Sequence, residues 1–329
     1  MSSMKAMILA AGYGERLWPL TADRTKPALP VLGKPLVGYV AEYLARFGIT
    51  EAIVNLHHHP ESVRRALGNG RQFGVHLQYV HEPVILGTSG ALDNARALLS
   101  DDTFIVVNGK LITDLDLAAA LRKHQQRKAL ATLVLRRNEQ FERFSFVEVR
   151  DGLVTRFAGM PSRETWKSSE SPLMFTGIHI VEPRIFDYVP RGVFSDSVID
   201  VYPRAIAKGE RIVGHVAAGR WYELSTLRRY LDISLALLRQ EQRDVYLGAN
   251  SSIDPSAEVR EAILWDNVAV APGAMVRRSI LGDHVSIKAG ESIQDAVVVR
   301  ADIVAHQKAP AKAMPGIVQG ENFVVSLSQ

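Results

Sequence analysis

Hydrophobic and polar positions along the chain fall into two patterns, one before and one after Arg243. In the first part, short apolar runs typical of strands alternate with segments whose apolar residues recur every three or four positions, as in amphipathic helices. The predicted strands cover residues 4–9, 51–56, 75–80, 103–107, 129–135, 144–150, 174–181 and 211–217, and the predicted helices cover residues 36–47, 91–99, 115–121, 198–207 and 227–239. This alternation predicts an α/β domain over residues 1–243, with a Rossmann-like, mostly parallel sheet covered on both faces.

After Arg243 the pattern changes to a repeat of 17 residues. The segments that begin at Ser252, Ala269 and Ser286 align in register, and apolar residues recur in them at steps of six, six and five. These apolar positions are Ile253, Val259, Leu264, Val270, Val276, Leu281, Ile287, Ile293 and Val298. Such a period predicts a solenoid whose units bury their apolar residues against each other. We therefore expect a second domain at residues 244–329, with three coils over residues 252–302 that resemble a short left-handed parallel β-helix. The tail after Ala309 is either a capping strand or loosely ordered.

Composition and charge narrow the class of protein. A chain of 329 residues with 47% hydrophobic residues suffices for two domains with a substantial core. The apolar run at residues 4–9 is too short for a signal peptide or a membrane span, and the chain has no cysteine, so we expect a soluble protein of the reducing cytoplasm. The net charge is +4, but Lys and Arg are scattered, which favours attraction for phosphates over nucleic-acid binding.

The loop after the first predicted strand carries the main candidate chemistry. It reads LAAGYGERLWPLTADRTKPALPVLGKP, from Leu9 to Pro35. Gly12 and Gly14 let backbone N–H groups approach a phosphate without an intervening Cβ, and Arg16 and Lys26 add cationic donors. Neither the Walker pattern GxxxxGK[ST] nor the Rossmann pattern GxGxxG is present. On these residues alone, the glycines are equally consistent with an ordinary turn.

The loop as a whole closely resembles the signature of the sugar-1-phosphate nucleotidylyltransferases, also called NDP-sugar pyrophosphorylases. In that signature a strand leads into LAAGxGxRLxPLT, a Lys-Pro pair and LPVxGKP. Further matches follow in the same order and cover nearly the whole chain: VNLHHHPE (residues 54–61), Glu82 followed by LGTSGAL (86–92), VVNG (106–109), TDLDL (113–117), FTGIHIVEP (175–183) and GRWYELSTLRRYL (219–231). The motifs are most similar to the mannose-1-phosphate guanylyltransferase-like group. The resemblance implies the nucleotide-diphospho-sugar transferase fold, and several members carry a terminal β-helix.

The resemblance also implies a reaction and a set of site residues. A phosphate oxygen of a sugar 1-phosphate attacks the α-phosphorus of a nucleoside triphosphate, and pyrophosphate leaves. Since that oxygen is already deprotonated at neutral pH, the reaction requires positioning and charge neutralisation, normally by cations and Mg²⁺, rather than a general base. Arg16 is implied to hold the triphosphate, and Lys26 the α-phosphate and sugar phosphate. Nucleotide contacts are implied for Leu9, Ala11, Gly12, Gly14, Glu82, Gly87 and Asn108. Glu82 would accept from a purine edge, and Gly177 would let the sugar lie close to the backbone.

Four positions depart from the family pattern. Lys110 stands where the family usually has a Mg²⁺-binding Asp, and Glu223 stands where it has a second Asp, which makes Glu223 a candidate sugar-phosphate residue and metal ligand. Gly159-Met160-Pro161 replaces Glu-Lys-Pro, and Phe144-Ser145 replaces Tyr-Gly. In one interpretation, the Lys110 ammonium takes the place of the metal and supports a weaker transfer, with GTP and mannose 1-phosphate as the first expectation. In the other, the protein is a regulatory homologue that binds a nucleotide sugar without turnover.

Two other features invite different functions. The run His57-His58-His59 suggests a metal site, but consecutive side chains point in different directions, so a loop or helix-start role is favoured. Hexapeptide β-helices also occur in acyltransferases. Three coils offer little surface for an acyl-CoA, and His284 and His306 are the only histidines in the repeats or just after them. Self-association into a homo-oligomer is the preferred role for this domain.

Overall fold

The structure is a computed structural model that describes residues 4–164 and 166–328. The chain forms two compact units. The first, here named the sheet unit, contains residues 4–12, Val37–Pro60 and Leu67–Trp221. The second, the repeat unit, contains Tyr13–Leu36, Glu61–Ala66 and residues 222–328. The sequence predicts a boundary near Arg243, whereas most of the loop after the first strand belongs with the C-terminal residues.

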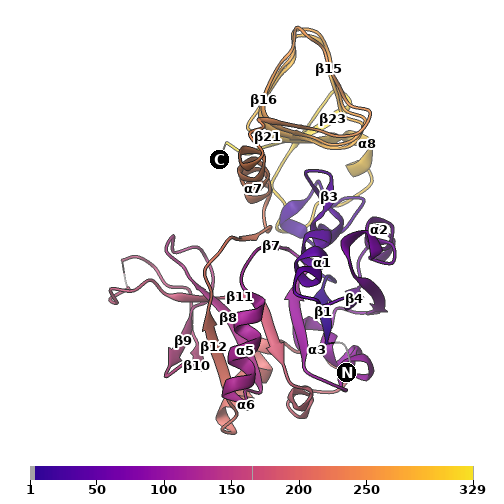
Figure 1. Ribbon diagram of the computed structural model, residues 1–329. Helices are drawn as coiled ribbons and strands as arrows, with labels where there is room; N and C mark the ends of the chain where they lie inside the picture. Colours follow the sequence, from indigo (N-terminus) through magenta and orange to yellow (C-terminus); the bar gives the residue numbers. More distant parts are fainter. Residues whose placement is uncertain (1–3, 165, 329) are drawn as a thin grey trace. The chain divides into compact units, whose positions relative to one another are not determined.

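The sheet unit is built on one mixed sheet (Figure 1). Its strands lie in the order β5 (His76–His81), β4 (Glu51–Leu56), β1 (Lys5–Leu9), β6 (Phe104–Asn108), β11 (Leu173–Val181), β8 (Ala131–Arg137), β12 (Ile212–Val216), β10 (Leu153–Phe157) and β9 (Val147–Arg150). β11 runs antiparallel to β6 and β8, and β10 runs antiparallel to β12 and β9. The other strands share one direction, so the sheet is mostly parallel as expected, with β5, β4, β1 and β6 as its continuous parallel part.

Helices connect these strands and begin close to the predicted positions. They are α1 (Leu36–Arg46), α2 (Pro60–Leu67), α3 (Gly87–Asn94), α4 (Arg96–Leu99), α5 (Leu117–Arg127) and α6 (Tyr202–Ala207), with short strands β7 (Leu111–Thr113) and β13 (Trp221–Glu223). The predicted helix at residues 91–99 is in fact two helices, and the one at 198–207 begins with a π-helical turn, Ser197–Val201. Strand β10 was missed because it alternates poorly and is largely exposed at its centre.

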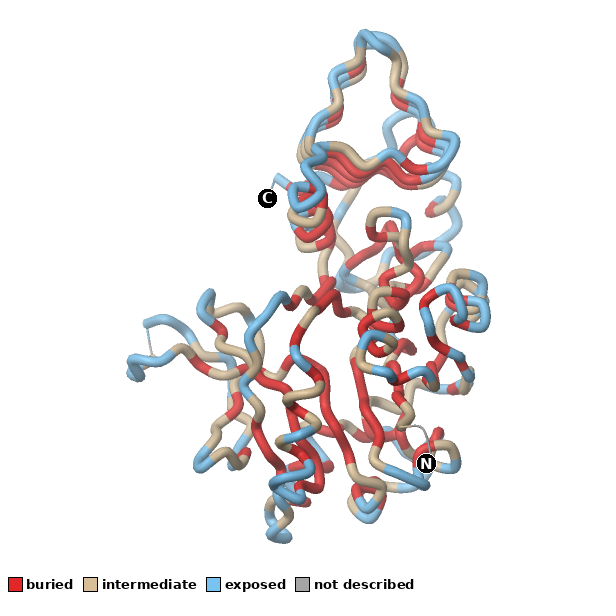
Figure 2. The backbone as a smooth tube through the Cα atoms, in the orientation of Figure 1, coloured by how far each residue is buried: buried red, intermediate tan, exposed pale blue. Residues whose placement is uncertain are grey.

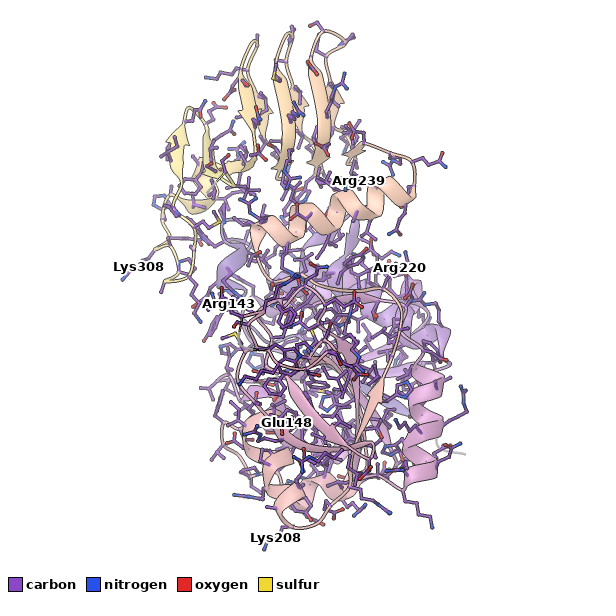
Figure 3. All side chains as sticks on the ribbon, turned by 90° about the vertical axis from the view of Figure 1, so that its left-hand side faces the viewer. Arg143, Glu148, Lys208, Arg220, Arg239 and Lys308 are labelled. Atoms are coloured by element: carbon purple, nitrogen blue, oxygen red, sulfur yellow. The ribbon has the colours of Figure 1, made fainter. Side chains whose placement is uncertain are left out.

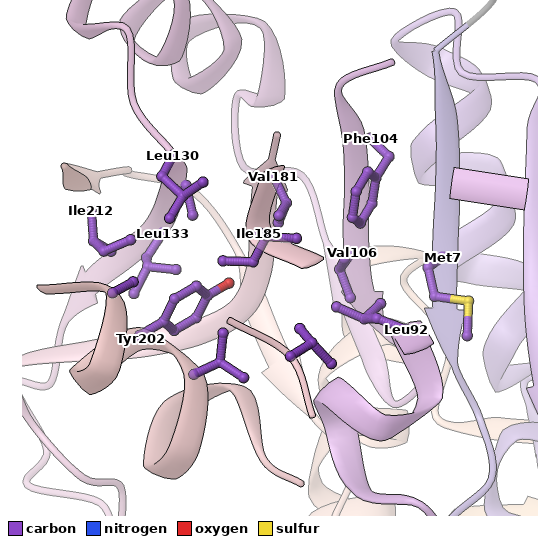
Figure 4. Close-up of a cluster of buried hydrophobic side chains, with 14 of the residues drawn as sticks. Met7, Leu92, Phe104, Val106, Leu130, Leu133, Val181, Ile185, Tyr202 and Ile212 are labelled. Atoms are coloured by element: carbon purple, nitrogen blue, oxygen red, sulfur yellow. The ribbon is translucent and has the colours of Figure 1, made fainter. Parts of the chain in front are cut away.

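The core of the sheet unit lies between strands and helices on both faces of the sheet. Met7, Phe104, Val106 and Tyr202 belong to one buried cluster (Figure 4). Much of the central sheet is drawn as buried in Figure 2. Ile105 and Val107, which alternate with Phe104 and Val106 along β6, are buried as completely as those two residues. A strand that is covered on both faces has a continuous apolar sequence, and this explains the run FIVV that precedes Asn108.

The repeat unit stacks parallel strands at an offset of 17 residues. One sheet contains β15 (Ser252–Ile253), β17 (Ala269–Val270) and β19 (Ser286–Ile287), and the other contains β14 (Val245–Leu247), β16 (Glu258–Leu264), β18 (Met275–Leu281), β20 (Ser292–Gln294) and β21 (Ala296–Arg300). The buried cluster between them contains Leu264, Val270, Val276, Leu281, Ile287, Ile293 and Val298, with Ile253 and Val259 packed against it. The predicted 17-residue register and its apolar positions are therefore confirmed.

The remaining elements complete the repeat unit. The tail ends in β23 (Asn322–Ser326), which pairs antiparallel with β21 and with β22 (Ile317–Gln319), so the tail forms a capping strand. Helix α7 (Leu227–Gln240) begins after Thr226, whose side chain accepts a hydrogen bond from the Arg229 N–H. A hairpin of β2 (Pro30–Val31) and β3 (Lys34–Pro35), the short helix α8 (Ala301–Val304) and most of α2 also belong here. Within residues 4–164 and 166–328, every helix is too short or too polar to cross a bilayer.

Candidate active site

The carboxyl ends of β1 and β6 meet at one edge of the parallel part of the sheet. The Gly109 N–H donates to the Leu9 carbonyl oxygen at 2.9 Å. A Cβ at position 109 would lie 2.9 Å from that oxygen, so the backbones approach as closely as they do because residue 109 is glycine. Ligands of open α/β sheets bind at this kind of edge. Leu9, Asn108 and Gly109, all in predicted motifs, are therefore brought together there.

A bulge in β11 brings Gly177 to the same edge. The pairing of β11 with β8 shifts register between Phe175 and His179, and Gly177 has a φ of +82°. A Cβ at position 177 would overlap the Asn108 amide nitrogen and lie 2.8 Å from its Cγ. The Trp221 indole N–H donates to the Thr176 carbonyl at 3.0 Å and holds the bulge in place. The structure thus places two predicted site residues, Asn108 and Gly177, in contact.

Lys110 follows directly in the turn between β6 and β7 and is half-buried. Its position in the chain is the one at which the resemblance implies a metal-binding aspartate. An ammonium group cannot ligate a cation, and the described residues contain no group of three His, Asp or Glu side chains arranged to hold a metal. The donor set around residue 110 therefore does not fit a protein-bound Mg²⁺ of the family type.

The turn at Gly87, for which the resemblance implies a nucleotide contact, is a second part of the candidate site. Gly87 has a φ of +76° and begins α3, and a Cβ there would overlap the Ser195 carbonyl oxygen. That oxygen accepts hydrogen bonds from the N–H groups of Ser89 and Gly90, at 3.1 and 3.3 Å. The LGTSG motif is therefore fixed against the segment before the π-helical turn.

Glu82 lies just before this turn and is almost completely buried, with 1% of its surface exposed. One carboxylate oxygen accepts from the Asn55 side-chain amide at 2.7 Å, and the other accepts from the Leu86 N–H at 3.1 Å. Both oxygens thus have partners within the chain. A contact between Glu82 and a purine edge stays a prediction. Within the protein, the two hydrogen bonds make Glu82 a buried link between the Asn55 side chain and the Leu86 backbone.

Of the predicted phosphate-binding residues, Gly14, Arg16 and Lys26 belong to the repeat unit, whereas Ala11 and the exposed Gly12 end the sheet-unit segment. Gly14 has a φ of +69°, and a Cβ there would lie 3.0 Å from the Lys26 Cβ. The Gly14 carbonyl accepts from the Leu17 N–H at 2.9 Å and from the Thr21 hydroxyl at 3.3 Å. Arg16 is exposed within this turn, and Lys26 is half-buried beside it.

The same loop is anchored to the C-terminal repeats by contacts that the sequence does not reveal. The Arg24 guanidinium donates to the Asp283 carboxylate at 2.7 Å and lies over the Trp265 ring, 5.1 Å from its centroid. The Trp265 indole N–H donates to the Tyr230 hydroxyl at 3.0 Å, and that hydroxyl donates to the Pro30 carbonyl. The contacts that Arg24 and Pro30 make are 200 or more residues apart in sequence, and they explain why the loop is part of the repeat unit.

The structure also shows the surroundings of the other three positions that depart from the family pattern. Glu223 is buried in the repeat unit, and its carbonyl oxygen accepts from the Arg229 guanidinium at 3.0 Å. Met160 is 57% exposed, and Phe144 packs edge-on against Trp221 with centroids 5.4 Å apart. Neither replacement supplies the cation that Glu-Lys-Pro would bring.

The three histidines of residues 57–59 make different contacts, although the His58 and His59 rings lie with their centroids 4.1 Å apart. The ring Nδ1 of His57 lies 2.8 Å from the Glu82 carbonyl oxygen, and His59 adopts a positive φ of 42° just before α2. Partial burial, followed by the neighbouring His59 and His57, lowers the pKa of His58 below its ordinary value. These positions fit the expected role at a helix start.

Asn55 is the residue of this site that sequence reasoning missed. Its side chain is 3% exposed and accepts from the Ala10 N–H at 2.6 Å. The available signal was Asn55 within the apolar run AIVNL of β4, at a position where a hydrophobic side chain is the rule for a buried strand.

Comparisons with known proteins agree with this geometry. The model of the nucleotidyl transferase family matches residues 5–240. The UTP–glucose-1-phosphate uridylyltransferase of Synechocystis sp. is 31% identical over 271 residues, which cover 78% of this chain and 67% of the relative. The N-acetylmuramate alpha-1-phosphate uridylyltransferase of Neisseria meningitidis is 34% identical over 231 residues, 69% of this chain and 95% of the relative.

A guanylyltransferase and a solved structure are also similar. The mannose-1-phosphate guanylyltransferase of Mycobacterium tuberculosis is 30% identical over 236 residues, 71% of this chain and 64% of the relative. A Bacillus anthracis structure assigned as a glucose-1-phosphate thymidylyltransferase, in complex with sucrose, superposes with a TM-score of 0.62 at 25% identity and covers 72% of this chain and 95% of that one. The chain therefore belongs to the nucleotidyl transferase family, whose named relatives are sugar-phosphate nucleotidyltransferases.

Proposed function

We propose that this protein transfers a nucleotidyl group from a nucleoside triphosphate to a sugar 1-phosphate, with GTP and mannose 1-phosphate as the first pair to test. The observation that carries the proposal is the meeting of Leu9, Asn108 and Gly177 at one sheet edge, where Gly109 and Gly177 allow the neighbouring segments to approach closely. This is the kind of edge at which open α/β sheets bind ligands. The relatives include both uridylyl and guanylyl transferases, so UTP is the second base to test.

The reaction that we propose is an in-line displacement. A phosphate oxygen of the sugar 1-phosphate forms a bond to the α-phosphorus, the bond from that phosphorus to the bridging oxygen breaks, and pyrophosphate carries away the electron pair. Because the nucleophile is already an anion, the residues position two anions and neutralise their charge. Arg16 and Lys26 supply cations in the loop around Gly14, and Lys110 supplies one after β6.

Lys110 distinguishes this chain within the proposed mechanism. Since its donor set does not fit a protein-bound Mg²⁺, no step is assigned to a metal held by residue 110. One ammonium charge gives roughly half the Coulomb attraction of a divalent ion at equal distance and dielectric. Transfer is therefore expected to be slower than with an aspartate-bound metal. Any Mg²⁺ that accompanies the triphosphate enters as part of the substrate.

The alternative is a regulatory homologue that binds a nucleotide sugar without turnover. Two replacements favour it, because Lys110 removes a metal ligand and Met160 removes a cation on the sugar-phosphate side. Both hypotheses predict nucleotide binding, and they differ in the release of pyrophosphate.

The test measures pyrophosphate from each of GTP, UTP, dTTP, ATP and CTP with a panel of hexose 1-phosphates, with and without Mg²⁺. We expect transfer with at least one pair, and Lys110→Ala to lower kcat/KM by about 100-fold, the usual effect of removing one charge-stabilising group. Lys208→Ala is the matched control, since Lys208 is exposed and points away from the sheet unit (Figure 3).

Nucleotide-sugar binding without any product would reject the catalytic proposal. A Lys110→Asp variant with strong, Mg²⁺-dependent turnover would identify a metal site that the lysine has replaced.

For the repeat unit we propose a left-handed parallel β-helix that serves self-association of a cytoplasmic protein. The parallel strands at a 17-residue offset support the coil. The edge strand β22 supports the association, because Ile317 and Val318 are 67% and 66% exposed on it. The mass of the protein in solution tests this role, which we prefer to acyl transfer.

A further inference from the structure

Asn55 and Glu82 form a buried polar bridge between two segments of the sheet unit. Asn55 lies in β4, and Glu82 follows the neighbouring parallel strand β5. Their exposed fractions are 3% and 1%. On one side Asn55 contacts the backbone at Ala10, and on the other Glu82 contacts the backbone at Leu86.

The bridge is a chain of three hydrogen bonds with a fixed direction. The Ala10 N–H donates to Asn55 Oδ1 at 2.6 Å, Asn55 Nδ2 donates to Glu82 Oε1 at 2.7 Å, and the Leu86 N–H donates to Glu82 Oε2 at 3.1 Å. Only one orientation of the Asn55 amide satisfies both of its neighbours, because a carboxylate accepts and cannot donate. The bridge therefore couples the identity of residue 55 to that of residue 82.

The backbone of residue 82 is fixed as well. Its N–H donates to the Leu56 carbonyl at 2.8 Å, and its carbonyl oxygen lies 2.8 Å from the His57 ring Nδ1. Burial of a carboxylate is costly unless its oxygens are hydrogen-bonded, so a residue of this kind is retained here only with its partners in place. The surrounding backbone thus fixes the position of Glu82. Glu82 can in turn fix the positions of the Asn55 side chain and the Leu86 backbone.

The two ends of the bridge lie beside backbone that the proposed function assigns to the nucleotide. Ala10 directly precedes Ala11 and Gly12, and Leu86 directly precedes Gly87 at the start of α3. We propose that Asn55 and Glu82 are positioning residues that set the separation of these two segments, an inference that rests on the proposed function. Preorganised backbone of this kind lowers the cost of binding, so the bridge acts on affinity for the triphosphate more than on the chemical step.

The test exchanges the two functional groups. Glu82→Gln places an NH₂ against one of the two donors, and Asn55→Asp places two carboxylates face to face. Each single variant is expected to raise KM for the nucleoside triphosphate about tenfold, the equivalent of one lost buried hydrogen bond, with little change in kcat or in KM for the sugar phosphate.

The double variant Asn55→Asp/Glu82→Gln restores every bond. Asp at 55 accepts from the Ala10 N–H and from the new amide, and the carbonyl oxygen of Gln at 82 accepts from the Leu86 N–H. KM for the triphosphate is expected to return to within about threefold of the wild-type value, as additivity fails for residues in one network. Asn138→Asp is the matched control, because Asn138 is also 3% exposed but its side chain bonds to the Glu142 backbone, far from the proposed nucleotide segments in sequence. It is expected to lower the melting temperature without raising KM for the triphosphate.

Three outcomes overturn the inference. They are equal effects on both substrates, unchanged KM in the single variants, and a double variant no better than the worse single one. Failure of the proposed function is recognised separately, as absence of both turnover and nucleotide binding by calorimetry in the wild-type protein. The exchange rates of the Ala10 and Leu86 amide hydrogens then decide the inference, since they need no ligand. Faster exchange in each single variant and wild-type protection in the double variant support the bridge, and identical protection in all variants rejects it.

Discussion

At the scale of the residue, the contact between Gly177 and Asn108 shows why position 177 is a glycine. We predict that Gly177→Ala destabilises the sheet unit and abolishes most activity, because the added methyl group overlaps the Asn108 side chain at a φ of +82°. Gly209→Ala separates the cost of backbone strain from the cost of steric overlap. Gly209 has the same φ of +82°, but a Cβ added there would meet open space.

Chemical denaturation of the two variants gives the comparison. Gly209→Ala is expected to cost about 1–2 kcal/mol of unfolding free energy from backbone strain alone, and Gly177→Ala clearly more. Adding Asn108→Ala to Gly177→Ala removes the overlapped atoms and is expected to recover part of the difference. Equal losses in the two glycine variants would contradict the assigned role of the contact.

Site residues could be predicted from the sequence only when a motif carried them. Leu9, Asn108, Gly109 and Gly177 lie together as the motifs suggest. The partners of Glu82 could not be predicted, because they depend on which side-chain oxygen faces which donor across two strands. Asn55 is a polar residue within an apolar run. Such a residue indicates that its side chain has a hydrogen-bond partner, but the sequence does not show which residue that partner is.

At the scale of the element, periodicity predicted most strands, helices and the 17-residue register of the repeats. It did not predict that the loop around Gly14 and Lys26 would join the repeats, because the joining contacts are single side chains such as Arg24. The local sequence pattern shows the periodicity of each helix or strand. Contacts between elements that are distant in sequence depend instead on tertiary packing, which this periodicity does not show.

Arg24 tests whether the repeats hold the loop around Gly14 and Lys26 in place. Arg24→Ala removes the ion pairs with Asp23 and Asp283 and the contact with the Trp265 ring. The partly buried Asp283 carboxylate then loses its cation and keeps the hydrogen bond from the Asp266 N–H. We expect a loss of about 1–2 kcal/mol in unfolding free energy and a raised KM for the triphosphate, since Lys26 is two residues away.

The control for this variant is Arg300→Ala. Arg300 pairs with Asp302 in the same unit, but both side chains are about half exposed or more, at 47% and 61%, so its removal is expected to cost little. A KM that rises equally in the two variants would show that the loop does not depend on the Arg24 contacts.

At the scale of the whole molecule, the stability of the sheet unit is expected to depend on pH through one buried histidine. His179 lies in β11, is 3% exposed, and its ring Nδ1 is hydrogen-bonded to the Tyr202 hydroxyl. Burial lowers the pKa of His179 from 6.5 to about 3. The folded protein therefore keeps this ring neutral over a range in which the unfolded chain binds a proton.

The sign of the effect follows from that difference. The contribution of His179 is fully present above pH 6.5 and is lost progressively as the pH falls from 6.5 towards 3, because protonation stabilises the unfolded chain. At pH 5 the loss is about 2 kcal/mol, from about 1.4 kcal/mol for each pH unit below 6.5. The measurement compares urea unfolding of wild-type protein and His179→Gln between pH 7.5 and pH 5. The variant keeps a polar partner for Tyr202 without the titrating group, so its stability should fall less with acid, and parallel curves for the two proteins would contradict the prediction.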